Sequence, residues 1–185
     1  RLGRQEISYT DHARYRNCDG VLIASVNFTD PGVIELASGK IPVVAIDFIF
    51  EGCGSIESDN LQGIEDLVTY VYSQGHRKIG EDPAVTRLRV TGSPRPCRKL
   101  GLKIPEEYVI PAIYHDSTSS EEATKQLLAL KDPPTCILYP DDMSYIGGLT
   151  YLEKQGLRVP EDISCAGYDG MKFSQMLRPK LTTLQ

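Results

Sequence analysis

The sequence predicts an α/β protein built on parallel β-sheet. Three observations lead to this prediction: short apolar runs alternate with amphipathic segments, the turns between them are short, and the run at residues 43–47 is hydrophobic at consecutive positions. Continuous hydrophobicity is typical of strands that are covered on both faces, as in parallel sheets. Strands that alternate with helices through short turns favour parallel pairing with right-handed crossovers.

In the first half of the chain, the apolar run at residues 21–25 predicts a buried strand. Residues 31–38 predict a helix that ends at Gly39, and residues 43–47 predict the next strand. After a glycine-containing loop, residues 58–60 supply Ser, Asp and Asn as candidate cap residues. Apolar side chains then recur at helical spacing up to Gly75, at Ile64, Leu67, Val68, Val71 and Tyr72.

The second half repeats this alternation. Residues 119–122 form a capping-box pattern ahead of a helix that Asp132-Pro-Pro ends, and residues 136–139 predict a strand. Asp141 and Asp142 can cap the next helix, which Gly156 ends, and residues 163–168 predict the last clear strand. Ligands of such sheets bind beyond the carboxyl ends of the strands. The expected ligand positions are therefore Ser25, Asp47, Asp141 and Asp169.

Two segments fit the alternation poorly. A buried strand is expected near residues 77–83, where Ile79 is the apolar residue that remains, and residues 92–97 place two prolines where a helix should run. The chain also begins without an obvious first strand and ends directly after residues 181–184. We therefore expect it to be part of a longer chain.

Composition and charge narrow the classes of function. The chain has 185 residues, of which 41% are hydrophobic and 24% charged, as in ordinary soluble globular proteins. A formal net charge of −5 argues against this segment itself wrapping nucleic acid, because phosphate binding needs clustered Lys and Arg. No apolar run approaches the length of a membrane span, so no membrane partner is expected. The start of the chain has no signal-peptide hydrophobic region, which favours the cytoplasm, although a processed periplasmic protein would also lack one.

The sequence contains no motif for catalysis, a metal or a cofactor. The cysteines are scattered without a CxxC pair, which favours reduced thiols in a reducing cytoplasm, and the histidines show no metal-ligand spacing. There is no GxxxxGK[ST] phosphate loop and no GxSxG nucleophile elbow. For His76, just past a predicted helix end, we expect a structural hydrogen bond. The chain is therefore predicted not to be an enzyme and to need no cofactor.

Seven short stretches carry a resemblance to a known family. They are CDGVLIA at 18–24, IPVVAID at 41–47, SDNLQG at 58–63, GHRKI at 75–79, RVTG at 89–92, GLRVPEDISCAGYD at 156–169 and KLTTL at 180–184. Each stretch alone is a weak signal, but seven in the correct order argue against coincidence. They resemble motifs of the regulatory core of the lactose-repressor (LacI/GalR) family of bacterial transcription regulators.

The resemblance implies a periplasmic-binding-protein-like fold of type I. It has two similar lobes, each a parallel sheet flanked by helices, with a small molecule in the cleft between them. Residues 1–77 and 182–185 would form the N-terminal lobe and residues 78–181 the C-terminal lobe, with residues 181–184 a crossover between them. The family's DNA-binding helix-turn-helix headpiece is not in this chain, and family members generally form homodimers on two-fold operators.

The resemblance also assigns roles to two residues. Asp169 directly follows a strand, where the family places a carboxylate that accepts hydrogen bonds from a sugar or another ligand. The alternative is that Asp169 caps the next turn. Arg89 matches the arginine of the RxxG motif, and its planar guanidinium suits a vicinal diol or a carboxylate. The alternative for Arg89 is a solvated helix arginine.

Other candidates end strands of the predicted sheet. Asp141 occupies a position where the family commonly carries a ligand-contacting Asn or Asp, whereas Asp142 is expected to be the helix cap. Asp47 and Phe48 pair a carboxylate with a ring that can cover the apolar face of a sugar, although a core role for Phe48 is equally open. Ser25 is a weaker candidate of the same kind.

These observations favour a ligand-responsive bacterial transcription regulator. A sugar or similar small metabolite would bind between the lobes and alter operator affinity through the absent headpiece of a cytoplasmic homodimer. The main alternative is a periplasmic sugar-binding protein for transport or chemotaxis, which shares the fold. A small enzyme on a flavodoxin-like sheet is a second alternative, but it would need a nucleophile or a phosphate loop that the sequence does not contain.

Overall fold

The chain divides into two compact units in the computed structural model, which describes residues 7–81 and 100–185. The units are Arg1–Asp59 and Asn60–Gln185. Each contains its own parallel β-sheet, so the predicted α/β class with parallel strands is confirmed.

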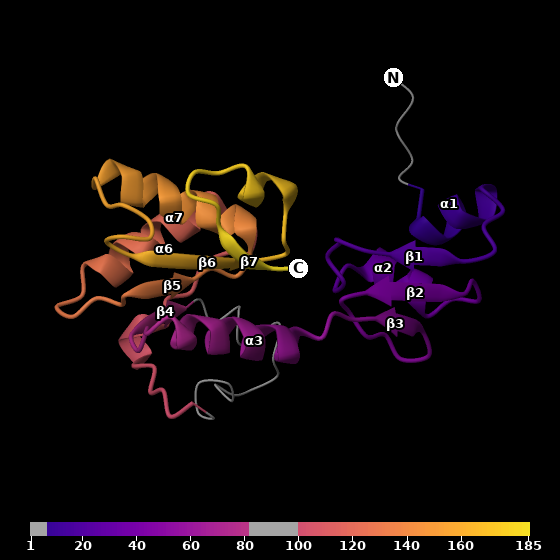
Figure 1. Ribbon diagram of the computed structural model, residues 1–185. Coiled ribbons are helices and arrows are strands. Elements are labelled where there is room, and N and C mark those ends of the chain that lie inside the picture. The colour runs from indigo at the N-terminus through magenta and orange to yellow at the C-terminus, as the bar shows by residue number, and fades with distance from the viewer. Residues whose placement is uncertain (1–6, 82–99) are drawn as a thin grey trace, which may run out of the picture. The chain divides into compact units, whose positions relative to one another are not determined.

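The first unit has a three-stranded parallel sheet in the order β1-β2-β3 (Figure 1). Its elements are α1 (Tyr9–Tyr15), β1 (Val21–Ile23), α2 (Pro31–Ala37), β2 (Val43–Ile46) and β3 (Gly54–Ile56). Helix α2 begins at Pro31, as predicted, and Asp30 is its cap. Its buried Val33 and Leu36 pack with Ile23 and Val43 of the sheet.

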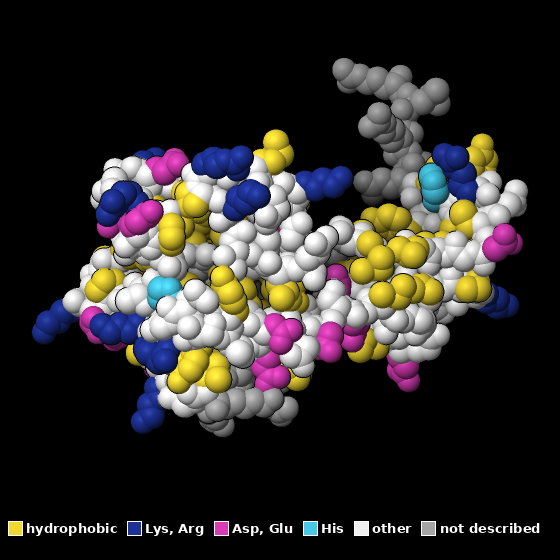
Figure 2. Space-filling view, in the orientation of Figure 1, with side chains coloured by type: hydrophobic (Ala, Val, Ile, Leu, Met, Phe, Trp, Pro, Cys, Tyr) yellow, Lys and Arg dark blue, Asp and Glu magenta, His cyan; other side chains and the backbone are white. Residues whose placement is uncertain are grey.

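The opposite face of this sheet is open to solvent. Alternate residues of each strand point to that face, and there Leu22 is 60% exposed and Ile56 57% exposed. Figure 2 shows hydrophobic side chains gathered over this unit. The hydrophobic run at residues 43–47 predicted a sheet covered on both faces. Among the described residues of the first unit, only one face of the sheet is covered.

The second unit has a four-stranded parallel sheet in the order β4-β5-β6-β7. Its strands are β4 (Ile79–Glu81), β5 (Cys136–Leu138), β6 (Ser164–Tyr168) and β7 (Thr182–Leu184). Its helices are α3 (Asn60–Ser73), α6 (Ser117–Leu128) and α7 (Asp142–Lys154), with short 3-10 turns η1 (Glu106–Tyr108) and η2 (Lys172–Gln175). Helix α3 lies on one side of the sheet, and α6 and α7 lie on the other (Figure 1).

Both faces of the second sheet are buried, and the side chains alternate between them. Leu138 and Tyr168 pack against the apolar face of α3. In that face, Val68 is 1% exposed. Ile137 and Cys165 point to the other side, where the helices α6 and α7 cover them. This period-two alternation explains why the strands of this sheet are hydrophobic at consecutive positions.

The boundary between the units differs from the expected one. We expected the N-terminal part to extend to residue 77, but α3 packs on the sheet of the second unit. Residues 181–184 were expected to cross back to the first lobe, whereas Thr182–Leu184 forms β7, paired in parallel with β6. Helical periodicity identifies the buried face of α3 but not the sheet that it covers.

One local expectation is corrected, and another is confirmed. Helix α6 starts at Ser117 with Asp116 as its cap, so Ser119 and Glu122 are not the capping box. The segment that fitted a strand poorly does form β4, in which Gly80 and Glu81 are buried with Ile79. A Cβ at Gly80 would crowd the side chains of Pro134 and Leu127, which would have to shift to admit it. Residues 92–97 lie outside the described residues.

Candidate functional site

In the first unit, the predicted ligand positions follow the strands in an unusual backbone conformation. Ser25 comes after β1 with φ 54°, and Asp47 comes directly after β2 with φ 59°. L-amino acids rarely adopt the left-handed region, because Cβ approaches the following carbonyl oxygen. The backbone N–H of Asp47 donates to the carbonyl oxygen of Ile56 at 2.9 Å, which ties the residue to the strand β3. Both side chains are exposed.

Phe48 belongs to an aromatic cluster. Its ring stacks on that of Phe28 with centroids 4.6 Å apart and an interplanar angle of 6°, and it lies 4.7 Å from the ring of Phe50. All three rings are half-buried. The structure therefore supports a packing role for Phe48 and leaves its predicted contact with a ligand as a proposal.

In the second unit, Asp169 directly follows β6 with φ 93° and is half-buried. The hydroxyl of Tyr114 donates to its Oδ2 at 3.3 Å. The two residues are far apart in the sequence, but the loop before α6 brings Tyr114 to the carboxyl end of β6. Asp169 is thus held by Tyr114, which was not among the predicted ligand residues.

Asp141 takes the capping role that was expected for Asp142. Asp141 is the cap of α7: its Oδ1 accepts the backbone N–H of Ser144 at 2.7 Å, and its Oδ2 accepts the hydroxyl of Ser144 at 2.8 Å. Asp142 is the first residue of the helix, and its carboxylate binds other segments. Both side chains are fully buried. The expectation that Asp142 is the cap is therefore wrong, because the helix begins at Asp142, one residue earlier than that assignment requires.

His115 also binds Asp141. Its backbone N–H donates to Oδ2 of Asp141 at 3.0 Å, and its Nδ1 lies 3.3 Å from Oδ1. The ring of His115 packs against that of Tyr114 with centroids 3.8 Å apart, and both residues are exposed. The carboxylates after β5 and β6 therefore each meet one residue of this adjacent pair. Two neighbouring polar rings just before a helix cap were the signal in the sequence.

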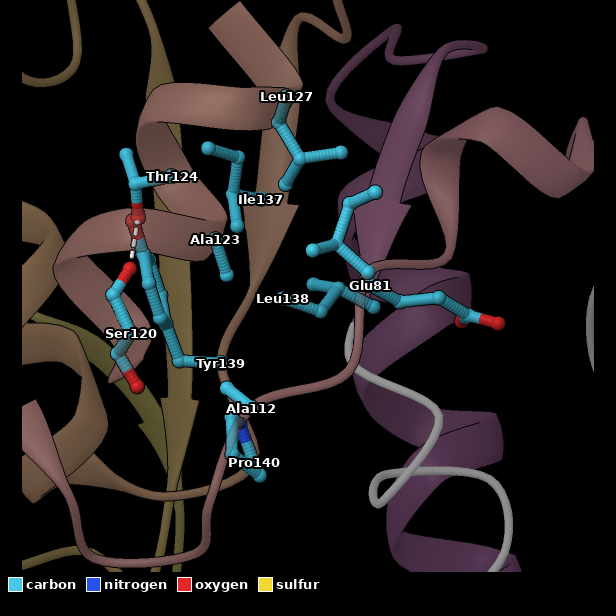
Figure 3. Close-up of a pocket in the computed structure, with 11 residues that line it drawn as sticks. Glu81, Ala112, Ser120, Ala123, Thr124, Leu127, Ile137, Leu138, Tyr139 and Pro140 are labelled. Carbon is cyan, nitrogen blue, oxygen red and sulfur yellow. Dashed lines mark hydrogen bonds between the residues drawn. The ribbon is translucent and has the colours of Figure 1, made fainter.

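A small pocket lies beside these groups, between β5 and α6 (Figure 3). Its lining is largely apolar, with a buried hydrogen bond of 2.9 Å between the hydroxyls of Thr124 and Tyr139. The hydroxyl of Ser120 is buried at the same pocket and has no hydrogen-bond partner among the described residues. The carboxylate of Glu81 points away from the other lining residues (Figure 3).

The remaining expectations concern residues outside this cluster. Arg89 lies outside the described residues, so its predicted contact with a ligand is a proposal. The ring of His76 makes the expected structural hydrogen bond, 2.9 Å from the hydroxyl oxygen of Thr135, and burial lowers its pKa. Cys18, Cys53, Cys136 and Cys165 are free thiols. The residues that the structure describes contain no group of side chains suited to a metal ion, and no helix long and apolar enough to cross a membrane.

Comparisons with known proteins agree with this architecture. The profile of the family described as "Periplasmic binding protein-like domain" matches residues 68–185. The HTH-type transcriptional repressor CytR of Escherichia coli (strain K12) is 31% identical over 188 residues, which cover 98% of this chain and 55% of CytR. The chain thus spans about half the length of this relative.

Solved structures of LacI-family regulators are also similar to this chain. A regulatory protein of LacI family from Chloroflexus aggregans superposes with a TM-score of 0.78 at 28% identity, covering 95% of this chain and 65% of that one. A LacI family transcriptional regulator from Enterococcus faecium, solved with bound ribose, has a TM-score of 0.78 at 24% identity, covering 96% of this chain and 68% of that one. The second likeness concerns the fold alone.

Proposed function

Because the chain belongs to the lactose-repressor (LacI/GalR) family of transcriptional regulators, we propose that it senses the effector in a ligand-responsive bacterial regulator. The effector is a sugar or a similar small polyhydroxylated metabolite. One observation carries this proposal: Ser25, Asp47 and Asp169 all follow parallel strands and all have left-handed backbones. Such conformations cost about 1 kcal/mol or more each and cluster at ligand sites.

The chemistry of these residues suits a polyhydroxylated ligand. Asp47 and Asp169 supply carboxylates, which accept strong and directional hydrogen bonds from paired hydroxyls. Phe48 can cover an apolar sugar face, and Arg89 is proposed to bind a vicinal diol with its planar guanidinium. The buried Asp141 contributes by holding His115 at the carboxyl end of β5.

The complete regulator is proposed to work as a clamp. The effector binds in the cleft between the two lobes of the family's fold, and the binding changes the relative orientation of the lobes. In a cytoplasmic homodimer this change repositions the DNA-binding headpieces, so that effector and operator affinities are coupled reciprocally. No catalytic step is part of the proposal, and the relatives described above are named as repressors and regulators.

The first test is thermal unfolding of the chain with D-ribose, D-glucose and D-galactose. We expect at least one sugar to raise the midpoint temperature of unfolding, because a ligand that binds the folded state stabilises it. The second test is fluorescence anisotropy of the full gene product with DNA from near its own gene, with and without that sugar. A full-length protein that bound none of this DNA under any ligand condition would refute the regulatory role.

A further inference from the structure

Asp142 carries a buried carboxylate that the proposed ligand site does not use directly. It is fully buried at the first position of α7, and none of the described cationic side chains forms an ion pair with it. Burial of a carboxylate is unfavourable unless hydrogen bonds satisfy its oxygens. Its hydrogen-bond partners therefore indicate its role.

The carboxylate of Asp142 joins α7 to two other segments. Its Oδ1 accepts the hydroxyl of Thr183 in β7 at 2.6 Å, and its Oδ2 accepts the backbone N–H of Met171 at 2.8 Å. The hydroxyl oxygen of Thr183 in turn accepts the backbone N–H of Gly170 at 3.2 Å. The two backbone amides that follow Asp169 are thus held by Asp142, one directly and one through Thr183.

The strand β6 is shaped to admit this carboxylate. A Cβ on Gly167 would lie 2.5 Å from Oδ1 of Asp142, so only glycine permits the approach. Burial raises the pKa of Asp142, the hydrogen bonds from Thr183 and Met171 oppose that rise, and the negative charge of Asp169 adds to it. The charge of Asp169 therefore disfavours the ionised form of Asp142.

We propose that Asp142 is a positioning residue of the ligand site, a role that rests on the proposed function. It fixes the turn of residues 169–171 and so holds Asp169 in its left-handed conformation, with the carboxylate presented beyond β6. Without these bonds the turn relaxes, and Asp169 must be ordered again each time a ligand binds. Ordering a side chain or a turn on binding lowers affinity.

The variants Asp142→Asn and Thr183→Val test this role. Asparagine places an amide where one carboxylate oxygen accepts a hydrogen bond, and valine removes the hydroxyl with little change of shape. The matched control is Asp116→Asn, at the cap of α6, which has no bond to the turn. Because Asp142→Asn can also impair folding, Thr183→Val provides an independent measurement.

The first measurement is hydrogen exchange of the Gly170 and Met171 amides by NMR in the whole chain. We expect exchange of Gly170 to be about tenfold faster or more in Thr183→Val, and of both amides in Asp142→Asn, with no change in the control. Unchanged exchange in both variants would overturn the proposal. This measurement needs no ligand, so it decides whether Asp142 holds the turn even if no sugar binds and the proposed function fails.

The second measurement is a double-mutant cycle with Asp169→Ala, using titration calorimetry with D-ribose, D-glucose and D-galactose. We expect Asp142→Asn to weaken binding about tenfold in the wild type but less than about twofold when Asp169 is already alanine. A merely structural role would weaken binding equally in both backgrounds, and that result would contradict positioning through Asp169.

Discussion

The two units present their candidate ligand groups in different ways. In the first unit, the carboxylate after β2 belongs to the exposed Asp47, next to the stacked rings of Phe28 and Phe48. In the second unit, Asp169 and Asp141 meet Tyr114 and His115, and buried hydrogen bonds fix the surrounding turns. The comparison indicates that the first unit offers an apolar surface, whereas the second offers oriented acceptors.

The difference follows from how each sheet is covered. The second sheet has helices on both faces, so the start of α7 is buried and its polar groups must find partners. The first sheet has one open face, and its strand ends are exposed. Polar groups are preorganised when a packed core surrounds them. Among the described residues, only the candidate site of the second unit has such a core around it.

The largest expected effect on stability lies where the helices of the second unit approach closely. A Cβ on Gly147 in α7 would lie 1.8 Å from the backbone oxygen of Ser117 in α6. We expect Gly147→Ala to lower the free energy of unfolding by about 3 kcal/mol, because the backbones must separate. The measurement is urea unfolding followed by circular dichroism.

The control for this change is Gly20→Ala in the first unit, where the nearest atom would lie 3.3 Å away. A loss below about 1 kcal/mol is expected there. Equal losses in the two variants would show that the close packing of α6 on α7 is not a special feature of the second unit.

The two helix caps give a matched pair with a smaller effect. Asp141→Ala removes a buried acceptor that binds Ser144 and His115, and we expect it to destabilise the protein by about 2–3 kcal/mol. Asp30→Ala removes the partly buried cap of α2 and should cost about 1 kcal/mol. Urea titrations of both variants measure the difference. A larger loss for Asp30→Ala would contradict the stronger preorganisation of the second unit.

The aromatic cluster of the first unit is expected to contribute less to the free energy of unfolding than the cap of α7 does. Phe48→Leu keeps an apolar side chain but removes the stack with Phe28, and should lower the free energy of unfolding by about 1 kcal/mol. Thermal unfolding measures this loss, and Tyr15→Leu, at an exposed ring, is the control. A Phe48→Leu protein as stable as the wild type would favour a role for this ring in ligand binding alone.

The smallest expected effect depends on pH. Two bonds from the side chain of Arg158 and one from its backbone hold the pKa of Asp162 at about 2, below the usual 3.8. A depressed carboxyl pKa contributes stability that is present above pH 3.8 and is lost as the pH falls toward 2. The difference in unfolding midpoint between wild type and Asp162→Asn should therefore shrink over that interval. Because the pair is exposed, high salt should also reduce the difference.

Much of the fold was predictable because its signals are local. The apolar runs of β2 and β5 and the amphipathic stripe of α3 are visible in the sequence. The strand β3 was not predicted, because Gly54–Ile56 is short and exposed and has no apolar pattern. Residues 181–184 were interpreted as a crossover from the family resemblance, and the pairing of Thr182–Leu184 with β6 could not be predicted from so short a segment.

The candidate site could also be predicted in part from local signals. The end of a strand is readable from hydrophobicity, so Ser25, Asp47 and Asp169 were placed correctly after their strands. The sequence could not distinguish Asp141 from Asp142 as the cap, because a shift of one residue in the start of α7 decides which of the two caps it. The contact of Tyr114 with Asp169 joins residues distant in sequence, and no local pattern encodes it.

The central claim is that Asp169, held beyond β6, is an acceptor for a polyhydroxylated ligand. Titration calorimetry of the wild type and Asp169→Ala with D-ribose, D-glucose and D-galactose tests it most directly, with Asp162→Asn as the control. We expect at least one sugar to bind the wild type and the control equally, and to bind Asp169→Ala about tenfold more weakly or worse. Equal affinity for all three proteins, or no binding of any sugar, would contradict it.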